Sequence, residues 1–195
     1  MILKLLFIIG SVCSYELISD FNLTKKDIDF YPCIGLNPIL KEKTLEVFEE
    51  INDLDMYNLN LKGQTHPVGF NEVNTICDYD KSATNSYGYC SFYPPTNETD
   101  IMISNALFNN PNNLYNVLLH EIVHALGLNH NKKNYGIMNY SVSLNSDYSL
   151  VNDRHLYLSI DDINGLKYLF NKNKQKQEEK ECKKRNILKL IRSCF

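Results

Sequence analysis

One stretch of eleven residues, from His120 to His130, constrains this chain more than any other. His120 and His124 are four positions apart, and Glu121 follows the first of them. On a helix, residues four apart lie on one face, so two imidazoles can bind one metal ion while the glutamate reaches a water molecule on that ion. The sequence therefore predicts a helix that carries two metal ligands and a general base.

A third ligand follows the predicted end of this helix. Gly127 can adopt the positive φ that ends a helix, and the chain can then turn and bring His130 back to the metal. Three neutral imidazoles with an open fourth position are typical of catalytic zinc, whereas structural zinc sites are usually closed by four protein ligands. Chance is a fair alternative for H-E-x-x-H alone, but the added glycine and histidine favour a zinc site. His66 and His155 match no ligand spacing and are interpreted as surface or hydrogen-bonded histidines.

The secondary structure around this segment alternates between strands and helices. Asn37-Pro38 and Asn110-Pro111 each combine an N-cap residue with a proline suited to the first helical position, so helices are predicted from 38 to about 52 and from 111 to about 126. A last helix is predicted to begin near Ser159, which forms an acidic capping box with Asp162. Strand-like segments are predicted at residues 27–35, 68–73, 88–93 and 100–104.

The residues already described resemble those of a known protease clan. His120 to His130 resembles the metzincin pattern H-E-x-x-H-x-x-G-x-x-H, and Met138 in the sequence GIMNY resembles its Met-turn. Met138 falls eight residues after His130, as in matrixins, and LSIDDINGL at 158–166 is similar to the start of their last helix. The resemblance spans about 28–170. It implies an α+β fold with a mostly parallel twisted sheet, two long helices, and a small C-terminal subdomain that holds the Met-turn and last helix.

This resemblance implies a secreted zinc-dependent endopeptidase that acts on polypeptides. His120, His124 and His130 would hold one catalytic zinc, and Glu121 would act as general acid and base on the zinc-bound water. The substrate is expected to lie extended along an exposed edge strand, for which 88–93 is the candidate. The alternative is a non-enzymatic secreted binding protein that keeps the zinc site; the intact Glu121 favours the enzyme.

Several positions depart from the matrixin pattern. The region that holds a second, structural zinc in matrixins offers only His66 here, so one zinc is predicted, and calcium binding is not indicated. The segment around Cys33 lacks the arginine and Pro-Asp of the cysteine switch, so Cys33 is interpreted as a core or paired cysteine. Tyr140, two residues after Met138, resembles a tyrosine of astacins and serralysins that can reach the zinc. It is either a donor to the developing oxyanion or part of the pocket wall.

The two ends of the chain differ from the segment between them. Residues 1–14 have a lysine, an apolar run and small residues, which is typical of a signal peptide, and 15–170 is the predicted catalytic domain. Little or no inhibitory propeptide is expected. Residues 171–195 form a basic tail, predicted helical, which is either a solvated helix or a contact for anionic surfaces. The net charge of -3 gives no argument for nucleic-acid binding, and a monomer is expected.

Secretion has further consequences for cysteines and asparagines. Asn22, Asn97 and Asn139 are candidate glycosylation sites. Removal of residues 1–14 leaves five cysteines, so at least one thiol has no partner within the chain. The expected disulfides are Cys77 with Cys90 and Cys182 with Cys194, while Cys33 remains an alternative partner for either C-terminal cysteine.

Overall fold

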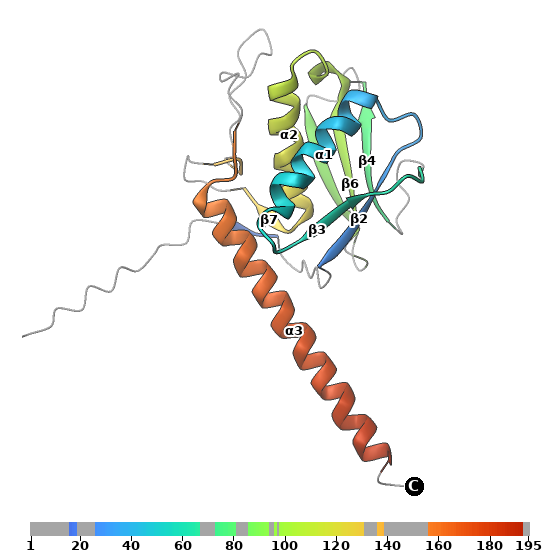
Figure 1. The fold of residues 1–195 in the computed structure, drawn as a ribbon, viewed down its shortest axis with the longest axis vertical. Coiled ribbons are helices and arrows are strands. Elements are labelled where there is room, and N and C mark those ends of the chain that lie inside the picture. Colours follow the sequence, from blue (N-terminus) through green and yellow to red (C-terminus); the bar gives the residue numbers. More distant parts are fainter. Residues whose placement is uncertain are drawn as a thin grey trace, which may run out of the picture.

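A five-stranded sheet with two helices on one face forms the body of the protein, and a third helix leads away from it (Figure 1). This is seen in a computed structural model that describes residues 16–18, 26–66, 73–80, 86–93, 96, 98–130, 136–138 and 156–192. The strand order is β3-β2-β4-β6-β5. The pairs β2–β3, β2–β4 and β4–β6 are parallel, and β5 pairs antiparallel with β6 at one edge. The α+β fold with a mostly parallel sheet is thus confirmed.

Most strand predictions are confirmed, and the differences have simple causes. The sheet strands are β2 (Asp27–Pro32), β3 (Asn58–Leu61), β4 (Asn74–Tyr79), β5 (Gly88–Tyr93) and β6 (Glu98–Ser104). The strand predicted at 68–73 falls mostly outside the described residues, and the strand that pairs with β2 begins later, at Asn74. The sequence analysis missed β3 because its four residues, Asn-Leu-Asn-Leu, are short and half polar.

The two sheet-packing helices begin where their caps predict. Helix α1 (Pro38–Asn52) follows Asn37, whose side chain accepts a hydrogen bond from the Ile39 amide, and α2 (Pro111–Ala125) follows Asn110, which caps the Asn113 amide. A short 3-10 helix, η2 (Asn105–Leu107), connects β6 to α2. The helices and the sheet enclose one large apolar core. Its fully buried members include Phe30, Leu40, Ile51, Ile101, Ile103, Leu114, Leu118 and Ile122.

The other face of the sheet carries the disulfide, and the predicted pairing of Cys77 with Cys90 is wrong. Cys33 and Cys77 are bonded, with Cα atoms 5.0 Å apart, and pack with Met102 in a second apolar cluster. Cys77 is paired in register with Met102, whereas Cys90 is paired with Ile101. Because successive residues of a strand point to opposite faces, Cys90 faces the main core and cannot reach Cys77. Cys194, the predicted partner of Cys182, lies outside the described residues.

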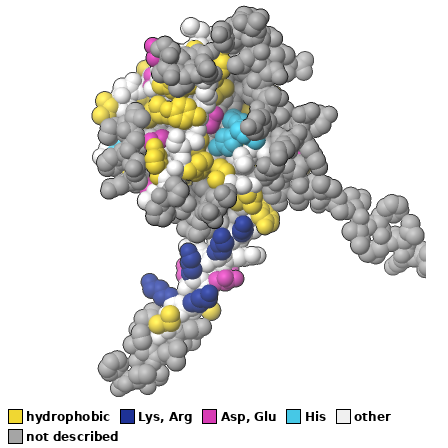
Figure 2. Space-filling view, turned by 180° about the vertical axis from the view of Figure 1, so that it is seen from behind, with side chains coloured by type: hydrophobic (Ala, Val, Ile, Leu, Met, Phe, Trp, Pro, Cys, Tyr) yellow, Lys and Arg dark blue, Asp and Glu magenta, His cyan; other side chains and the backbone are white. Residues whose placement is uncertain are grey.

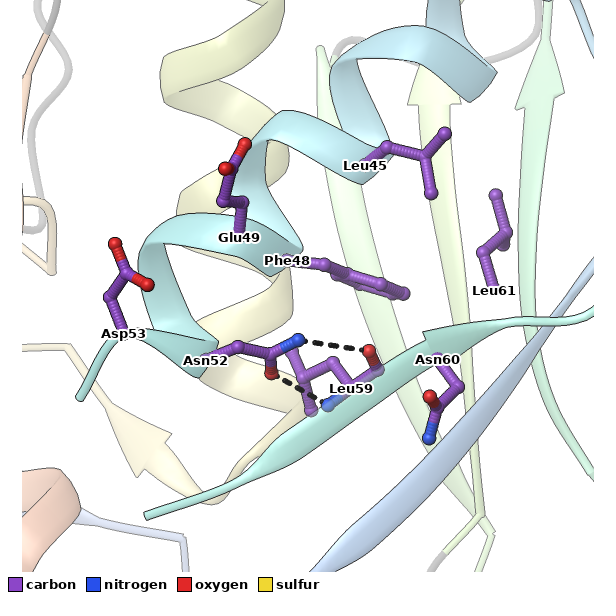
Figure 3. Close-up of a pocket in the computed structure, with 8 residues that line it drawn as sticks. All are labelled: Leu45, Phe48, Glu49, Asn52, Asp53, Leu59, Asn60 and Leu61. Carbon is purple, nitrogen blue, oxygen red and sulfur yellow. Dashed lines mark hydrogen bonds between the residues drawn. The ribbon is translucent and has the colours of Figure 1, made fainter. Parts of the chain in front are cut away.

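The edge strand β3 is covered by a side chain of α1. The Asn52 amide donates a hydrogen bond to the Leu59 carbonyl at 3.1 Å and accepts one from the Leu59 amide at 2.7 Å (Figure 3). One side chain thus satisfies both backbone groups that a further strand would use at this residue. Unpaired edges promote association between chains, so Asn52 protects this edge of the sheet.

Helix α3 (Ile160–Arg192) is anchored only near its start. Leu166 and Leu169 are buried, and Phe170 packs edge-on against Tyr57 with ring centroids 5.6 Å apart. After Asn173, the side chains that the structure describes on this helix are exposed, and Lys and Arg side chains follow it away from the body (Figure 2). The helix passes the predicted domain boundary at 170/171 without a break. In the described residues, no helix combines the length and the apolar character needed to cross a membrane.

Candidate active site

The end of α2 and the turn after it bring three histidines together. His120 and His124 lie on one face of the last turns of α2. The chain then reverses at Gly127, whose φ is 104°, positive as predicted. Strand β7 (Leu128–Asn129) follows and leads directly to His130. β7 pairs antiparallel with β1 (Glu16–Leu17), near the N-terminus, which fixes the direction of this segment. The histidine side chains form a cluster on one face of the molecule (Figure 2).

The ligand atoms of the three rings converge on one point. His130 Nε2 lies 3.2 Å from His120 Nε2 and 3.2 Å from His124 Nε2. On the other side of each helical ring, Nδ1 lies 2.7 Å from a carbonyl oxygen, that of Ile137 for His120 and that of Leu128 for His124. Because a carbonyl only accepts, each Nδ1 carries the proton, and each Nε2 directs a lone pair to the centre. The backbone thus selects the tautomer that metal binding requires.

Burial keeps the helical imidazoles neutral. It lowers the pKa of His120 to about 4, although the hydrogen bond to the Ile137 carbonyl opposes this shift. It also lowers the pKa of His124 to about 3. A metal ligand must be deprotonated, so these shifts favour metal binding at neutral pH.

Glu121, the residue after His120 on α2, carries a buried carboxyl group. Its side chain is only 6% exposed, and burial raises its pKa to about 8. The carboxyl group is therefore poised to exchange a proton near neutral pH, which is the property of a general acid or base.

The turn at Gly136–Met138 lies next to the histidine cluster and is held by α3. Met138 is buried, and Gly136 has φ of 127°. The Ile137 amide donates to Asp162 Oδ2 at 3.1 Å, while the Ile137 carbonyl faces His120. Asp162 also accepts from the amide and hydroxyl of Ser159, which confirms the predicted cap of this helix. The backbone of a single residue, Ile137, therefore connects the buried carboxylate of α3 to a ring of the histidine cluster.

The sequence of this region matches a known protease family. The family model described as matrixin matches residues 44–171, which is more than half of the chain and includes the three histidines, Glu121 and Met138. This chain belongs to the matrixin family. Matrixins are zinc metalloproteases, and membership places this chain in that class.

Solved structures of other proteins have folds similar to that of this chain. The structure of myroilysin superposes with a TM-score of 0.53 and 14% identity, covering 79% of this chain and 97% of that protein. Archaemetzincin from Methanopyrus kandleri gives a TM-score of 0.50 and 15% identity, covering 76% of this chain and 97% of that protein. At this identity, the likeness concerns the fold alone. Among curated proteins, none matches this chain in sequence.

The histidine cluster of this matrixin fits a zinc ion. With Zn–N bonds of about 2.0–2.1 Å and tetrahedral angles, two ligand nitrogens lie about 3.3 Å apart. The observed separations of 3.2 Å agree with this value. Two unprotonated nitrogens at that distance repel each other unless a cation lies between them, so the arrangement is suited to a metal. His120, His124 and His130 would hold the zinc ion. In the described residues, one ligand atom from each of these histidines lies within 4.8 Å of the other two.

The other predicted site residues are only partly covered. Tyr140, the sequon at Asn139 and His155 lie outside the described residues. His66 is away from the cluster, because its backbone bridges to Cys33 and its ring packs edge-on against Tyr31. Cys33 is bonded to Cys77, which confirms its interpretation as a core or paired cysteine, with Cys77 as partner in place of a C-terminal cysteine.

The groups that hold the ligands in place were not predicted from the sequence. The carbonyls of Leu128 and Ile137 leave no sequence signal, since every residue has one. Asp162 was identified only as a helix cap, and its contact with the Met-turn depends on how α3 packs. The matrixin-like positions of Met138 and of Asp161-Asp162 were the available indication that the Met-turn and α3 meet.

Proposed function

We propose that this chain is a secreted zinc endopeptidase that hydrolyses peptide bonds in polypeptide substrates. The observation that supports this best is the convergence of three Nε2 atoms on one point, with a buried glutamate, Glu121, following the first ligand on the same helix. A structural zinc site would need a fourth protein ligand, whereas here the neighbouring group is a proton acceptor.

Glu121 carries the proton transfers in this proposal. When bound, zinc would polarise the scissile carbonyl and make water a stronger acid. Glu121 accepts a proton from the attacking water and returns it to the leaving amine. Its burial supports both roles, because a carboxyl group with a raised pKa can release as well as accept a proton near neutral pH. The reaction needs no covalent intermediate with the chain.

The edge strand β5 is the proposed guide for the substrate. It pairs with β6 on one side and is the last strand of the sheet on the other. An extended peptide can add to such an edge through backbone hydrogen bonds, so recognition would depend little on side chains. The predicted residues 88–93 coincide with this strand.

Glu121→Ala tests the role of this residue directly. We expect the variant to keep its zinc and to lose at least about a hundredfold in rate on a peptide library. His124→Ala should instead lose the metal, as measured by metal analysis. Zinc retained in His124→Ala would contradict the ligand assignment. A wild-type protein that binds zinc but cleaves nothing would favour the binding-protein alternative.

Tyr140 is proposed as a candidate donor to the oxyanion, and Tyr140→Phe removes only its hydroxyl. If the hydroxyl stabilises the transition state, kcat and kcat/KM should fall together by about a hundredfold with zinc content unchanged. If the ring only forms a wall, both constants should stay within about threefold of wild type. Full glycan occupancy at Asn139, measured by mass spectrometry, would also argue against the catalytic role.

Secretion is supported by the signal-like residues 1–14 and by the Cys33–Cys77 disulfide, since disulfides persist mainly in oxidising compartments. Mass spectrometry of the secreted protein should find a disulfide-linked peptide containing Cys33 and Cys77. Reduced Cys33 and Cys77 in protein collected from the medium would contradict the disulfide.

The basic part of α3 is a proposed contact for anionic surfaces. Residues 172–195 hold nine Lys and Arg against three Glu, and the described ones project from the body. Lys183→Glu/Lys184→Glu should elute from heparin at lower salt than Lys41→Glu/Lys43→Glu, which changes the charge equally on α1. Equal elution of the two variants would leave the tail as a solvated helix.

A further inference from the structure

Gly88, the first residue of β5, is the point at which the edge strand meets the catalytic helix. A Cβ atom at this position would lie 2.7 Å from Val117 Cγ1 and 3.1 Å from both Cγ and Oε1 of Glu121. The backbone conformation at Gly88 is one that any residue adopts, because its φ is outside the left-handed region. The glycine therefore supplies room and not conformational freedom.

The space left by Gly88 is occupied by the side chain of the general base. Glu121 is 6% exposed and packs with one carboxylate oxygen against the β5 backbone. Val117, one helical turn before Glu121, fills the other side of this space. Backbone here is stiffer than a side chain, since Gly88 is paired in register with Ile103 of β6. The position of the carboxylate is thus limited by the edge strand as well as by its own helix.

The same strand is the proposed guide for the substrate. Each atom added at position 88 would move the carboxylate, the strand, or both, and so would change the distance between the base and a peptide lying on β5. Catalysis is sensitive to such changes, since a misplacement of about 1 Å can cost about a hundredfold in rate.

We propose that Gly88 is a positioning residue for peptide hydrolysis: its missing side chain lets β5 lie directly against Glu121, so that one backbone segment sets both the orientation of the base and the path of the substrate. This inference rests on the proposed endopeptidase function. Gly88 itself donates no group to the reaction.

Gly88→Ala tests this, with Gly63→Ala as the matched control, because a Cβ at Gly63 meets nothing within 4 Å. We expect kcat of Gly88→Ala to fall at least tenfold, with KM within threefold of wild type and one zinc retained. Gly63→Ala should keep both constants. The double variant Gly88→Ala/Val117→Ala removes the 2.7 Å contact with Val117 but keeps the 3.1 Å contacts with Glu121, so its kcat should stay at least threefold below that of Val117→Ala.

A second readout does not depend on turnover. In the Glu121→Gln background, which cannot cleave, Gly88→Ala should bind a fluorescent peptide within threefold of its parent, as measured by anisotropy. A loss of kcat that only follows the loss of folded protein in thermal melts, or that disappears in the Val117→Ala background, would overturn the inference. So would a Gly88→Ala variant as active as wild type. If the wild type and Gly63→Ala also fail to cleave peptides, the proposed function fails first and the inference falls with it.

Discussion

Asp162 shows how a single buried carboxylate can act on the metal site from another helix. Its Oδ2 accepts from the Ile137 amide, the Ser159 amide and the Ser159 hydroxyl, and it is 2% exposed. The Ile137 carbonyl in turn orients His120. Gly136 makes this approach feasible, because a Cβ there would collide with Asp162 and Ser159.

We therefore predict that Asp162→Asn weakens zinc binding about 10- to 100-fold, the usual effect of losing a group that supports a ligand. Asparagine offers an uncharged oxygen in place of the carboxylate Oδ2, so all three hydrogen bonds lose their charge-assisted strength and Ile137 is held less firmly. Competition with a chromogenic chelator measures the zinc affinity. Ser159→Ala is the comparison: it should lower thermal stability but leave the zinc affinity within about threefold. Equal zinc affinity in Asp162→Asn and wild type would contradict this connection.

The titrating groups of the site shift in opposite directions. In the folded metal-free protein, burial lowers the pKa of His120 to about 4 and of His124 to about 3, and raises that of Glu121 to about 8. The unfolded chain has ordinary values, about 6.5 for His and 4.3 for Glu. Below about pH 6.5 the unfolded chain binds more histidine protons, so the free energy of unfolding rises with pH. Between about pH 6.5 and 8 the folded protein binds one more proton than the unfolded chain, at Glu121. The free energy of unfolding therefore falls with pH in this range.

The metal-free protein should consequently be most stable near pH 6.5. Glu121→Gln should abolish the decrease in the free energy of unfolding between about pH 6.5 and 8, which is at most about 1.4 kcal/mol per pH unit in the wild type. The variant should still lose stability in acid, because the histidines are unchanged. Urea unfolding in the presence of a chelator, at intervals from pH 5 to 8.5, measures this. Parallel curves for the variant and the wild type above pH 6.5 would show that Glu121 is not the group involved.

At the scale of elements, the two edges of the sheet are treated differently. β3 is covered by Asn52, whereas β5, whose first residue lies against Glu121, is the proposed substrate strand. The difference arises because α1 returns directly to β3, so that its last residue, Asn52, faces Leu59 across the connection (Figure 3). Among the described residues, β5 pairs with a strand on one side only, at the edge whose first residue, Gly88, meets Glu121.

We predict that Asn52→Ala lowers the free energy of unfolding by about 1–3 kcal/mol, the usual cost of leaving buried backbone partners unsatisfied. It should also increase association at high protein concentration, because the β3 edge becomes available. Urea denaturation and light scattering measure the two effects. Asn60→Ala is the control, because the Asn60 side chain donates a hydrogen bond to the nearby Asn58 carbonyl. It should change the free energy of unfolding by no more than about 0.5 kcal/mol and should raise light scattering little. Similar behaviour of the two variants would contradict the role of Asn52.

At the scale of the whole molecule, most of the apolar core lies between the sheet, α1 and α2. Helix α3 packs on this core only through its first turns, at Leu166, Leu169 and Phe170. Most helical stability in proteins comes from tertiary packing, and the side chains described on α3 after Asn173 are exposed. One ion pair, Glu181 with Arg185 at 3.3 Å, is seen along the described basic part. The stability of α3 therefore decreases along its length.

Amide hydrogen exchange should show this gradient. We expect the amides of α3 after Asn173 to exchange orders of magnitude faster than those of α2 residues 117–123, because local opening there breaks few contacts. Addition of an anionic polymer that binds the tail should slow exchange in α3 alone. Protection of the distal helix equal to that of α2 would show that it packs against a partner.

The sequence by itself determined the features that depend on neighbours within a few residues. The spacing of His120, Glu121 and His124, the reversal at Gly127, and the helix starts at Asn37, Asn110 and Ser159 all follow from local geometry, and each was predicted. Only the tertiary structure decided which distant segments meet. The register of β4, β6 and β5 put Cys77 beside Cys33 and turned Cys90 to the opposite face. The packing of α3 brought Asp162 to Ile137, and the edge position of β5 brought Gly88 to Glu121. These contacts depend on strand order and on which face each residue occupies, and a shift of one residue in register would reverse every face, so no local pattern encodes them.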